Sequence, residues 1–198
     1  MEACLVPKSK KYIRQEVLGV ATQVFLRLGY GGASVETLVE ATGIHRRSMY
    51  GEFGDKDGLF LACIDHYANY TARHLFEILK SSPGGLQAIG EFFRERVDFS
   101  ANESCQGCLF VNTIIEGSLV APEALAKASM YLRILEDEFY VCLTVAQARG
   151  HISQDKDCRT LSLYLGCLLC GLMVKGKSIQ DRDSLDRFVQ VALEPLTA

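Results

Sequence analysis

The stretch from Ser34 to Phe53 constrains the fold of this 198-residue chain more than any other. Ser34 is of the type that caps helix N-termini, and apolar side chains follow it at helical spacing. Gly43 then supplies the residue that most easily adopts the left-handed conformation in which many helices end. We expect a second short helix to begin at His45. Two short helices around a glycine-containing turn predict a helix-turn-helix.

The second of these helices is basic. Met49 and Phe53 lie four residues apart, so both can face a core. This register leaves four side chains as candidates to face outward: His45, Arg46, Ser48 and Tyr50. From the pattern alone, the alternative is a helical hairpin whose basic face is only solvated.

Three motifs in register carry a resemblance to a known family: Leu28-Gly29-Tyr30, Ala41-Thr42-Gly43-Ile44 and Ser48-Met49-Tyr50-x-x-Phe53-x-x-Lys56-x-x-Leu59. Together they resemble the DNA-binding segment of the TetR (tetracycline-repressor) family. The likeness is good over residues 10–60 and holds only in outline after them. Glu52 departs from it, because many relatives carry an aromatic residue or His nearby. This carboxylate either points aside or accepts a hydrogen bond from a cytosine amino group.

The resemblance implies an all-α, homodimeric transcriptional regulator, most simply a repressor that binds a double-stranded DNA operator and is released by a small-molecule inducer. It implies a helix-turn-helix DNA-binding domain over residues 8–55 and a helical ligand-binding and dimerisation domain over 56–198. Phosphate contacts are expected from Ser34, Thr37, Tyr50 and Lys56. Base edges are expected to meet His45, Arg46, Arg47 and Ser48.

Net charge at first argues against a nucleic-acid partner, because the chain carries −3. The first 60 residues hold eight basic and seven acidic side chains, whereas the remainder holds 13 and 17. A basic face must therefore come from clustering. The start of the chain lacks the pattern of a secretory signal, and the longest uncharged run, residues 160–174, is too short to span a bilayer. We expect a soluble, cytoplasmic protein without a membrane partner.

Apolar residues recur at helical spacing along the whole chain, without strand-like alternation. Helices are predicted over residues 8–28, 55–81, 86–100, 108–120, 122–149, 155–175 and 184–196. The alternatives to a regulator are a small helical enzyme and a protein-interaction module. The four His are scattered, and no nucleophile or phosphate-loop motif is present. We therefore predict no enzymatic activity, no cofactor and no metal; a gel shift would exclude the interaction module.

A helix expected from Cys108 suggests the sensor site. Asn112 and Glu116 lie four residues apart on one face of this apolar helix, and a small-molecule pocket combines apolar walls with a few polar groups. The predicted ligand-binding residues are Phe92, Phe93, Cys108, Asn112, Glu116, Tyr131 and Phe139. The alternative is that Asn112 and Glu116 hydrogen-bond neighbouring helices.

Two of the eight cysteines, Cys105 and Cys108, form a C-x-x-C pair ahead of the same helix. The run at 107–112 resembles a TetR-type subgroup, some members of which respond to electrophiles, oxidants or metals. A helix N-terminus lowers a thiol's pKa, so Cys108 could be the sensor and Cys105 its resolving partner. Simple packing of both thiols is the other reading.

The last two predicted helices carry more apolar residues than one buried stripe needs, and Gly166 and Gly171 permit close approach. This surplus indicates a subunit interface. The resemblance implies that the two helices pair with their copies in a four-helix dimer bundle. The predicted interface residues are Leu161, Leu165, Leu168, Leu169, Leu172 and Phe188.

Overall fold

A computed structural model describes residues 10–81, 85–102, 105–179 and 181–197. These residues form α-helices, two short 3-10 turns and loops, without a strand in those ranges, as the sequence predicts. The elements are α1 (Lys10–Gly32), α2 (Val35–Thr42), α3 (Arg46–Phe53), α4 (Lys56–Ser81), α5 (Leu86–Ser100), α6 (Leu109–Glu116), η1 (Gly117–Leu119), α7 (Pro122–Ala148), α8 (Cys158–Lys175), α9 (Arg182–Leu193) and η2 (Glu194–Leu196).

The helix-turn-helix forms through the local signals that predicted it. Ser34 caps α2, because its Oγ accepts a hydrogen bond from the Thr37 N–H at 3.1 Å. Gly43 ends α2 in the left-handed conformation, with φ of 67°. Asp55 precedes α4 and accepts a hydrogen bond from the Gly58 N–H at 2.8 Å. The first two residues of the predicted DNA-binding domain, 8 and 9, lie outside the described residues.

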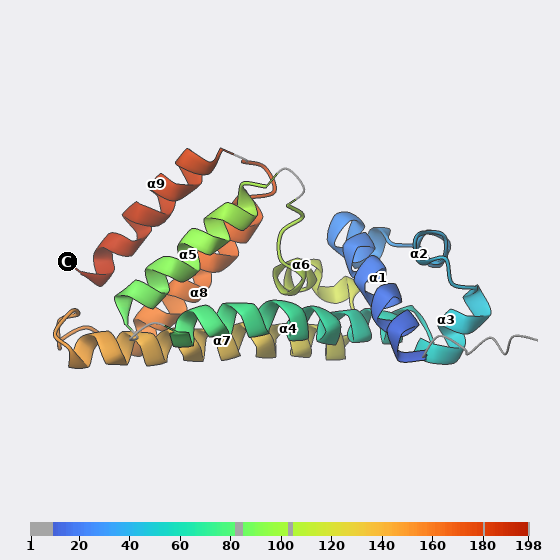
Figure 1. The fold of residues 1–198 in the computed structure, drawn as a ribbon, viewed down its shortest axis with the longest axis horizontal. Coiled ribbons are helices and arrows are strands. Elements are labelled where there is room, and N and C mark those ends of the chain that lie inside the picture. Colours follow the sequence, from blue (N-terminus) through green and yellow to red (C-terminus); the bar gives the residue numbers. More distant parts are fainter. Residues whose placement is uncertain (1–9, 82–84, 103–104, 180, 198) are drawn as a thin grey trace, which may run out of the picture.

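Helices α1, α2 and α3 gather at one end of an elongated molecule, and α5, α8 and α9 lie towards the other (Figure 1). The long α4 joins the two ends: α1 and α3 pack on it, as do α5 and α7. The short α6 contacts both α1 and α7. It therefore lies between the DNA-binding domain implied by the resemblance and the remaining helices.

The core of the second region is built around three fully buried aromatic rings. Phe92 packs edge to face on Phe93 and on Phe139, with ring centroids 5.3 and 4.9 Å apart. Helix α8 is long and apolar enough to cross a membrane by length and composition, with a mean hydropathy of 1.4. Its residues Leu165 and Leu172 are nevertheless fully buried in this core, as expected for a core helix.

Candidate DNA-binding surface and ligand cavity

The exposed side of α3 presents most of the residues predicted to face DNA. Met49 is fully buried and Phe53 is half-buried, so these two side chains fix α3 to the domain, as the spacing predicted. His45 is the N-cap residue of α3, with an extended backbone. The side chains left exposed are His45, Arg46, Arg47, Ser48 and Tyr50.

Two ion pairs organise this surface. Arg46 pairs with the exposed Glu36 of α2. The carboxylate of Glu52 accepts a hydrogen bond from Arg14 Nε at 3.1 Å, and the Arg14 guanidinium also lies 5.5 Å from the Phe53 ring centroid. Of the two alternatives that the sequence left open, Glu52 therefore points aside, to Arg14 of α1. Because Arg46 and Glu36 are solvent-exposed, their pair contributes little stability.

Tyr30, just beyond the kink in α1, connects α1 to the start of α4. The Lys56 ammonium lies 4.0 Å from the Tyr30 ring centroid and donates a 2.8 Å hydrogen bond to the Tyr30 carbonyl. The Tyr30 hydroxyl donates to Asp57. Burial, followed by the hydrogen bond to Asp57, raises the pKa of Tyr30 to about 12. Lys56 was predicted to contact phosphate; one of its three donors is used here, and two remain.

Glu116 does not lie in a pocket, contrary to the predicted ligand-binding role. Its two carboxylate oxygens accept hydrogen bonds from the backbone N–H groups of Tyr30 and Gly31, each at 2.8 Å. Gly29 interrupts α1 with φ of 73°, so these N–H groups begin a new helical turn and lack partners within it. A carboxylate at such a turn satisfies the donors and the helix dipole. We call this contact the Glu116 latch.

Asn112 also joins neighbouring elements, which is the alternative that the sequence left open. Its Nδ2 donates to the Gln106 carbonyl at 3.1 Å, and its Oδ1 accepts from Lys177 Nζ at 3.3 Å. The side chain is 8% exposed. Asn112 therefore fastens the 105–107 loop, and Lys177 two residues beyond α8, to α6.

The predicted aromatic walls of the pocket fill the core. Phe92, Phe93 and Phe139 have no exposed surface, and the rings of Phe93 and Phe139 stack with centroids 5.8 Å apart. Tyr131 stacks on Phe110 at 5.0 Å. These aromatics pack on one another in the core and line none of the cavities described below, so their ligand-binding role stays a prediction without support from the packing.

A cavity of about 870 Å³ lies elsewhere, between α1, α4, α5 and residues 105–107. We call it the α1–α4–α5 cavity. None of the seven predicted ligand-binding residues lines it. The described residues that do are Gly19, Thr22, Gln23, Leu26, His66, Tyr67, Tyr70, Thr71, His74, Leu75, Glu95, Arg96, Phe99, Asn102, Cys105, Gln106 and Gly107. The sequence signal for this cavity was the set of polar and aromatic side chains on the inner faces of α1 and α4. Hydrophobic periodicity alone assigns such side chains to the exposed surface of a helix.

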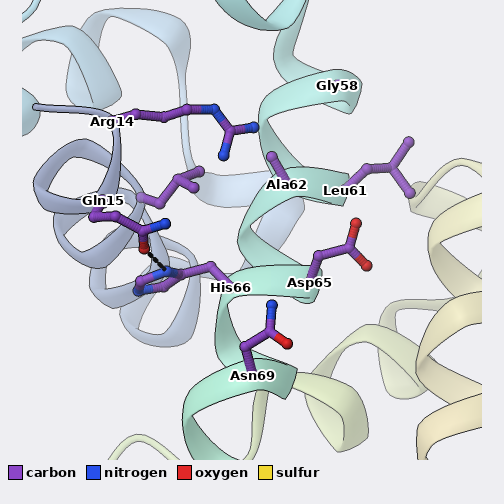
Figure 2. A pocket seen from close by; sticks show the side chains of 9 residues that line it. Arg14, Gln15, Gly58, Leu61, Ala62, Asp65, His66 and Asn69 are labelled. Atoms are coloured by element: carbon purple, nitrogen blue, oxygen red, sulfur yellow. Dashed lines mark hydrogen bonds between the residues drawn. The ribbon is translucent and has the colours of Figure 1, made fainter. Parts of the chain in front are cut away.

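A second cavity, of about 400 Å³, lies on another side of the α1–α4 contact. Figure 2 shows the His66 ring pointing towards Gln15, to which it is hydrogen-bonded at 2.9 Å, whereas Asp65 points away from both. Asp65 forms an ion pair with Lys127 of α7 at 2.6 Å. Burial and then the Arg14 charge lower the pKa of His66. Both polar side chains therefore have partners within the chain, and His66 lines the larger cavity as well.

The thiols of Cys105 and Cys108 are both buried and free. Burial raises the pKa of Cys108 and outweighs the opposing effect of the backbone N–H groups at the start of α6 and of the Tyr67 hydroxyl. The helix N-terminus does lower this pKa, as expected, but the effect of burial is larger and the net shift is upward. A thiol held in its protonated form is a poor nucleophile.

Four of the six predicted dimer-interface residues belong to the core of the subunit itself. Leu165, Leu168, Leu169 and Leu172 are at most 7% exposed. These leucines offer little surface to a second subunit, because α8 packs against α5 and α7 of its own chain. Leu161 is half-buried, and Phe188 is 44% exposed. The exposed apolar and cysteine residues on the same two helices are Leu163, Cys167, Val174, Phe188 and Val191.

Comparisons with known proteins agree with this arrangement. Residues 17–63 match the sequence model of bacterial regulatory proteins of the tetR family, and residues 85–192 match that of the tetracyclin repressor-like C-terminal domain. The chain is 30% identical over 191 residues to the HTH-type transcriptional regulator YezE of Bacillus subtilis (strain 168), covering 96% of this chain and 98% of YezE. It is 27% identical over 191 residues to the HTH-type transcriptional repressor ComR of Escherichia coli (strain K12), covering 93% and 88%.

A solved structure extends the likeness to three dimensions. A cysteine mutant of the TetR family transcriptional regulator CifR, complexed with 26-bp double-strand operator DNA, superimposes with a TM-score of 0.81. It shares 29% identity, and the match covers 95% of this chain and 98% of that chain.

Proposed function

This chain belongs to the tetR family and is a DNA-binding transcriptional regulator, and from that premise we propose that it is a homodimeric repressor released from its operator by a small molecule in the α1–α4–α5 cavity. The observation that carries the proposal is the position of this cavity. It is bounded on one side by α1 of the DNA-binding region and on the other by α4 and α5. A molecule bound there contacts both regions of the chain.

On the DNA side, α3 enters the major groove. Arg47 and Ser48 are exposed near the start of α3 and are placed to reach base edges, with His45 and Arg46 beside them. To contact DNA, Arg46 must break its ion pair with Glu36. Breaking this pair costs little free energy, because both side chains are solvent-exposed. Phosphates are contacted by Ser34 and Thr37 at the start of α2, by Tyr50 and by the two unused donors of Lys56.

Two copies of the chain must place their α3 helices one helical turn of DNA apart, about 34–36 Å, or a multiple of it. The face for dimerisation consists of the exposed apolar residues on α8 and α9, with Leu163, Phe188 and Val191 among the most exposed. Scattered apolar residues on a surface need no explanation, but several large ones on two helices linked by the Tyr164–Ala192 hydrogen bond favour a partner. The second copy supplies that partner.

Inducer binding acts on the separation of the two α3 helices. A ligand that binds better when α1 stands at a different distance from α4 and α5 shifts the population towards that arrangement. The Glu116 latch ties the end of α1 to α6, so this movement involves the whole DNA-binding region. Operator affinity then falls by the difference in the ligand's binding free energy between the two arrangements.

The thiol-based alternative, in which oxidation of Cys108 with Cys105 is the signal, receives less support. Both thiols are buried, and burial raises the pKa of Cys108. Neither property is typical of redox-sensing cysteines, which are exposed and of low pKa. We therefore assign the signal to a ligand.

The test begins by selecting bound fragments from the source genome and measuring their affinity by fluorescence anisotropy. We expect one pseudo-palindromic sequence to be enriched and bound by a dimer. Arg47→Ala should weaken binding to it, whereas Arg133→Ala, which removes the same charge from the exposed face of α7, should not. Absence of an enriched sequence, or equal binding by both variants, would contradict the proposal.

A further inference from the structure

We propose that the ligand of the α1–α4–α5 cavity is a monocarboxylate with an apolar or aromatic body, and that Arg96 binds its carboxylate. This inference rests on the proposed inducer role of the cavity and adds the chemical class of the ligand. It is carried by a buried guanidinium that lines the cavity with part of its hydrogen-bonding capacity unused.

Arg96 lies on α5 and is only 5% exposed. Its Nη2 donates to Glu95 Oε1 at 2.6 Å, and its Cζ lies 4.8 Å from the Phe99 ring centroid. Its Nε has no hydrogen-bond partner within the part of the chain that the structure describes. A buried unsatisfied donor on a charged group is costly, and in native proteins such a group commonly marks a bound molecule.

The charge of Arg96 is also incompletely balanced. Glu95 is the one carboxylate that lines the cavity among the described residues, and it is shared, because its Oε1 lies 3.4 Å from His74 Nε2 as well as 2.6 Å from Arg96. Glu95 is more exposed than Arg96, with side-chain values of 32% and 7%. A buried cation paired with one shared, partly solvated carboxylate can accept a second anionic partner.

A carboxylate matches what Arg96 offers. The planar guanidinium presents parallel N–H groups, and a carboxylate accepts two of them at once. A single negative charge suits the site better than a doubly charged phosphate, since Arg96 is the one Arg or Lys lining the described cavity and Glu95 would repel additional charge.

The remaining walls define the body of the ligand. Apolar and aromatic surface comes from Leu26 of α1, from Tyr67, Tyr70 and Leu75 of α4, and from Phe99 of α5. The volume of about 870 Å³ lies within the range of small-molecule sites. Leu26 belongs to α1 and Arg96 to α5, so an acid whose carboxylate is held by Arg96 can place its body against α1.

The test uses two matched pairs of probes on the full chain: 4-phenylbutanoate with 4-phenylbutanamide, and octanoate with octanamide. Each amide keeps the shape of its acid and removes the charge. Affinity is measured by isothermal titration calorimetry and thermal shift, without DNA. We expect the acid of at least one pair to bind 10-fold or more tightly than its amide, which corresponds to about 1.4 kcal/mol.

Arg96→Gln should remove this preference for the acid. Arg94→Gln is the matched control, because it removes the same charge two residues away on the exposed face of α5. If Arg96→Gln does not fold, Arg96→Lys replaces it, because it keeps the charge but loses the planar guanidinium. Arg96→Lys should weaken binding of the acid and leave binding of the amide unchanged.

Three results would overturn the inference: equal binding of acid and amide in both pairs, no binding of either acid at millimolar concentration, or an undiminished preference in the Arg96 variant. Operator binding without probe is measured in parallel. If the operator is bound and the acid preference is absent, only the ligand class is wrong. If no operator is bound, the proposed function fails on its own.

Discussion

The Glu116 latch makes a quantitative prediction for Glu116→Gln. The glutamine keeps the shape of the side chain and one acceptor oxygen, which can still bind one of the two N–H groups. Its amide nitrogen cannot accept the other, so either the Tyr30 or the Gly31 N–H loses its partner. The negative charge at the start of the helical turn after Gly29 is also lost.

The magnitude follows from the exposure of the contact. A hydrogen bond to a charged group contributes about 1.5–3 kcal/mol. Glu116 is half-buried and Gly31 is exposed, so water screens the contact and replaces part of it. We therefore expect the free energy of unfolding to fall by about 1–2 kcal/mol. Where local opening exposes the two amides, their hydrogen exchange should accelerate by about 5- to 30-fold, since 1.4 kcal/mol is a factor of ten.

Urea unfolding followed by circular dichroism gives the free energy, and hydrogen-exchange mass spectrometry of a peptide spanning residues 28–33 gives the exchange rates. Glu77→Gln is the matched control, because Glu77 is exposed on α4. An unfolding free energy within about 0.3 kcal/mol of the wild type, together with unchanged exchange at Tyr30 and Gly31, would refute the assignment of Glu116 as the link between α6 and α1.

The other predictions concern DNA, the dimer, the thiol and pH. Arg47→Ala should cost about 1–3 kcal/mol of operator affinity by anisotropy if this arginine reads a guanine; an unchanged affinity would remove it from the base-reading set. Phe188→Arg should give monomers by light scattering and a matching loss of operator binding, because one chain holds only a half-site; a stable dimer would move the interface away from α9. Cys108→Ser should leave any peroxide-driven release from the operator unchanged, since the thiol is buried and its pKa is raised; abolished release would make the thiol the sensor. His66 is held with a lowered pKa, so the unfolded state binds its proton first and stability falls as the pH drops below about 6.5. His66→Gln should flatten that part of the melting-temperature profile, and an identical slope in both proteins would exclude His66 as its source.

The parts of the fold that the sequence predicted are those with local causes. A cap such as Ser34 or a left-handed turn such as Gly43 depends on residues within a few positions, and both formed as expected. The same holds for Met49, whose burial follows from the register of α3. Side chains of α3 that are polar and not needed for packing are exposed, so the candidate DNA-facing set could be written down without a structure.

The predicted interface and pocket residues differ from those that the structure exposes, because periodicity shows that a side chain is apolar but does not show what it packs against. Leu165 and Leu172 read equally well as subunit core or as dimer surface until α5 and α7 are placed over them. Phe92 and Phe139 read equally well as pocket walls or as each other's packing partners. In both cases the choice depends on contacts between helices far apart in the sequence.

The latch and the cavity share a further reason for being invisible in the sequence. Glu116 and Tyr30 are separated by 86 positions, and their contact depends on a backbone break at Gly29 that leaves N–H groups without partners.

Arg96 would have been counted as an ordinary charged residue on an amphipathic helix, yet it is 5% exposed with an unsatisfied Nε. Its carboxylate partner, Glu95, is partly exposed. Taking a charge out of water is expensive, so natural chains retain a buried charge where it performs a function. The cavity that Arg96 lines is bounded by α1, and Glu116 holds the end of the same helix. The ligand that we propose and the latch therefore both act on α1.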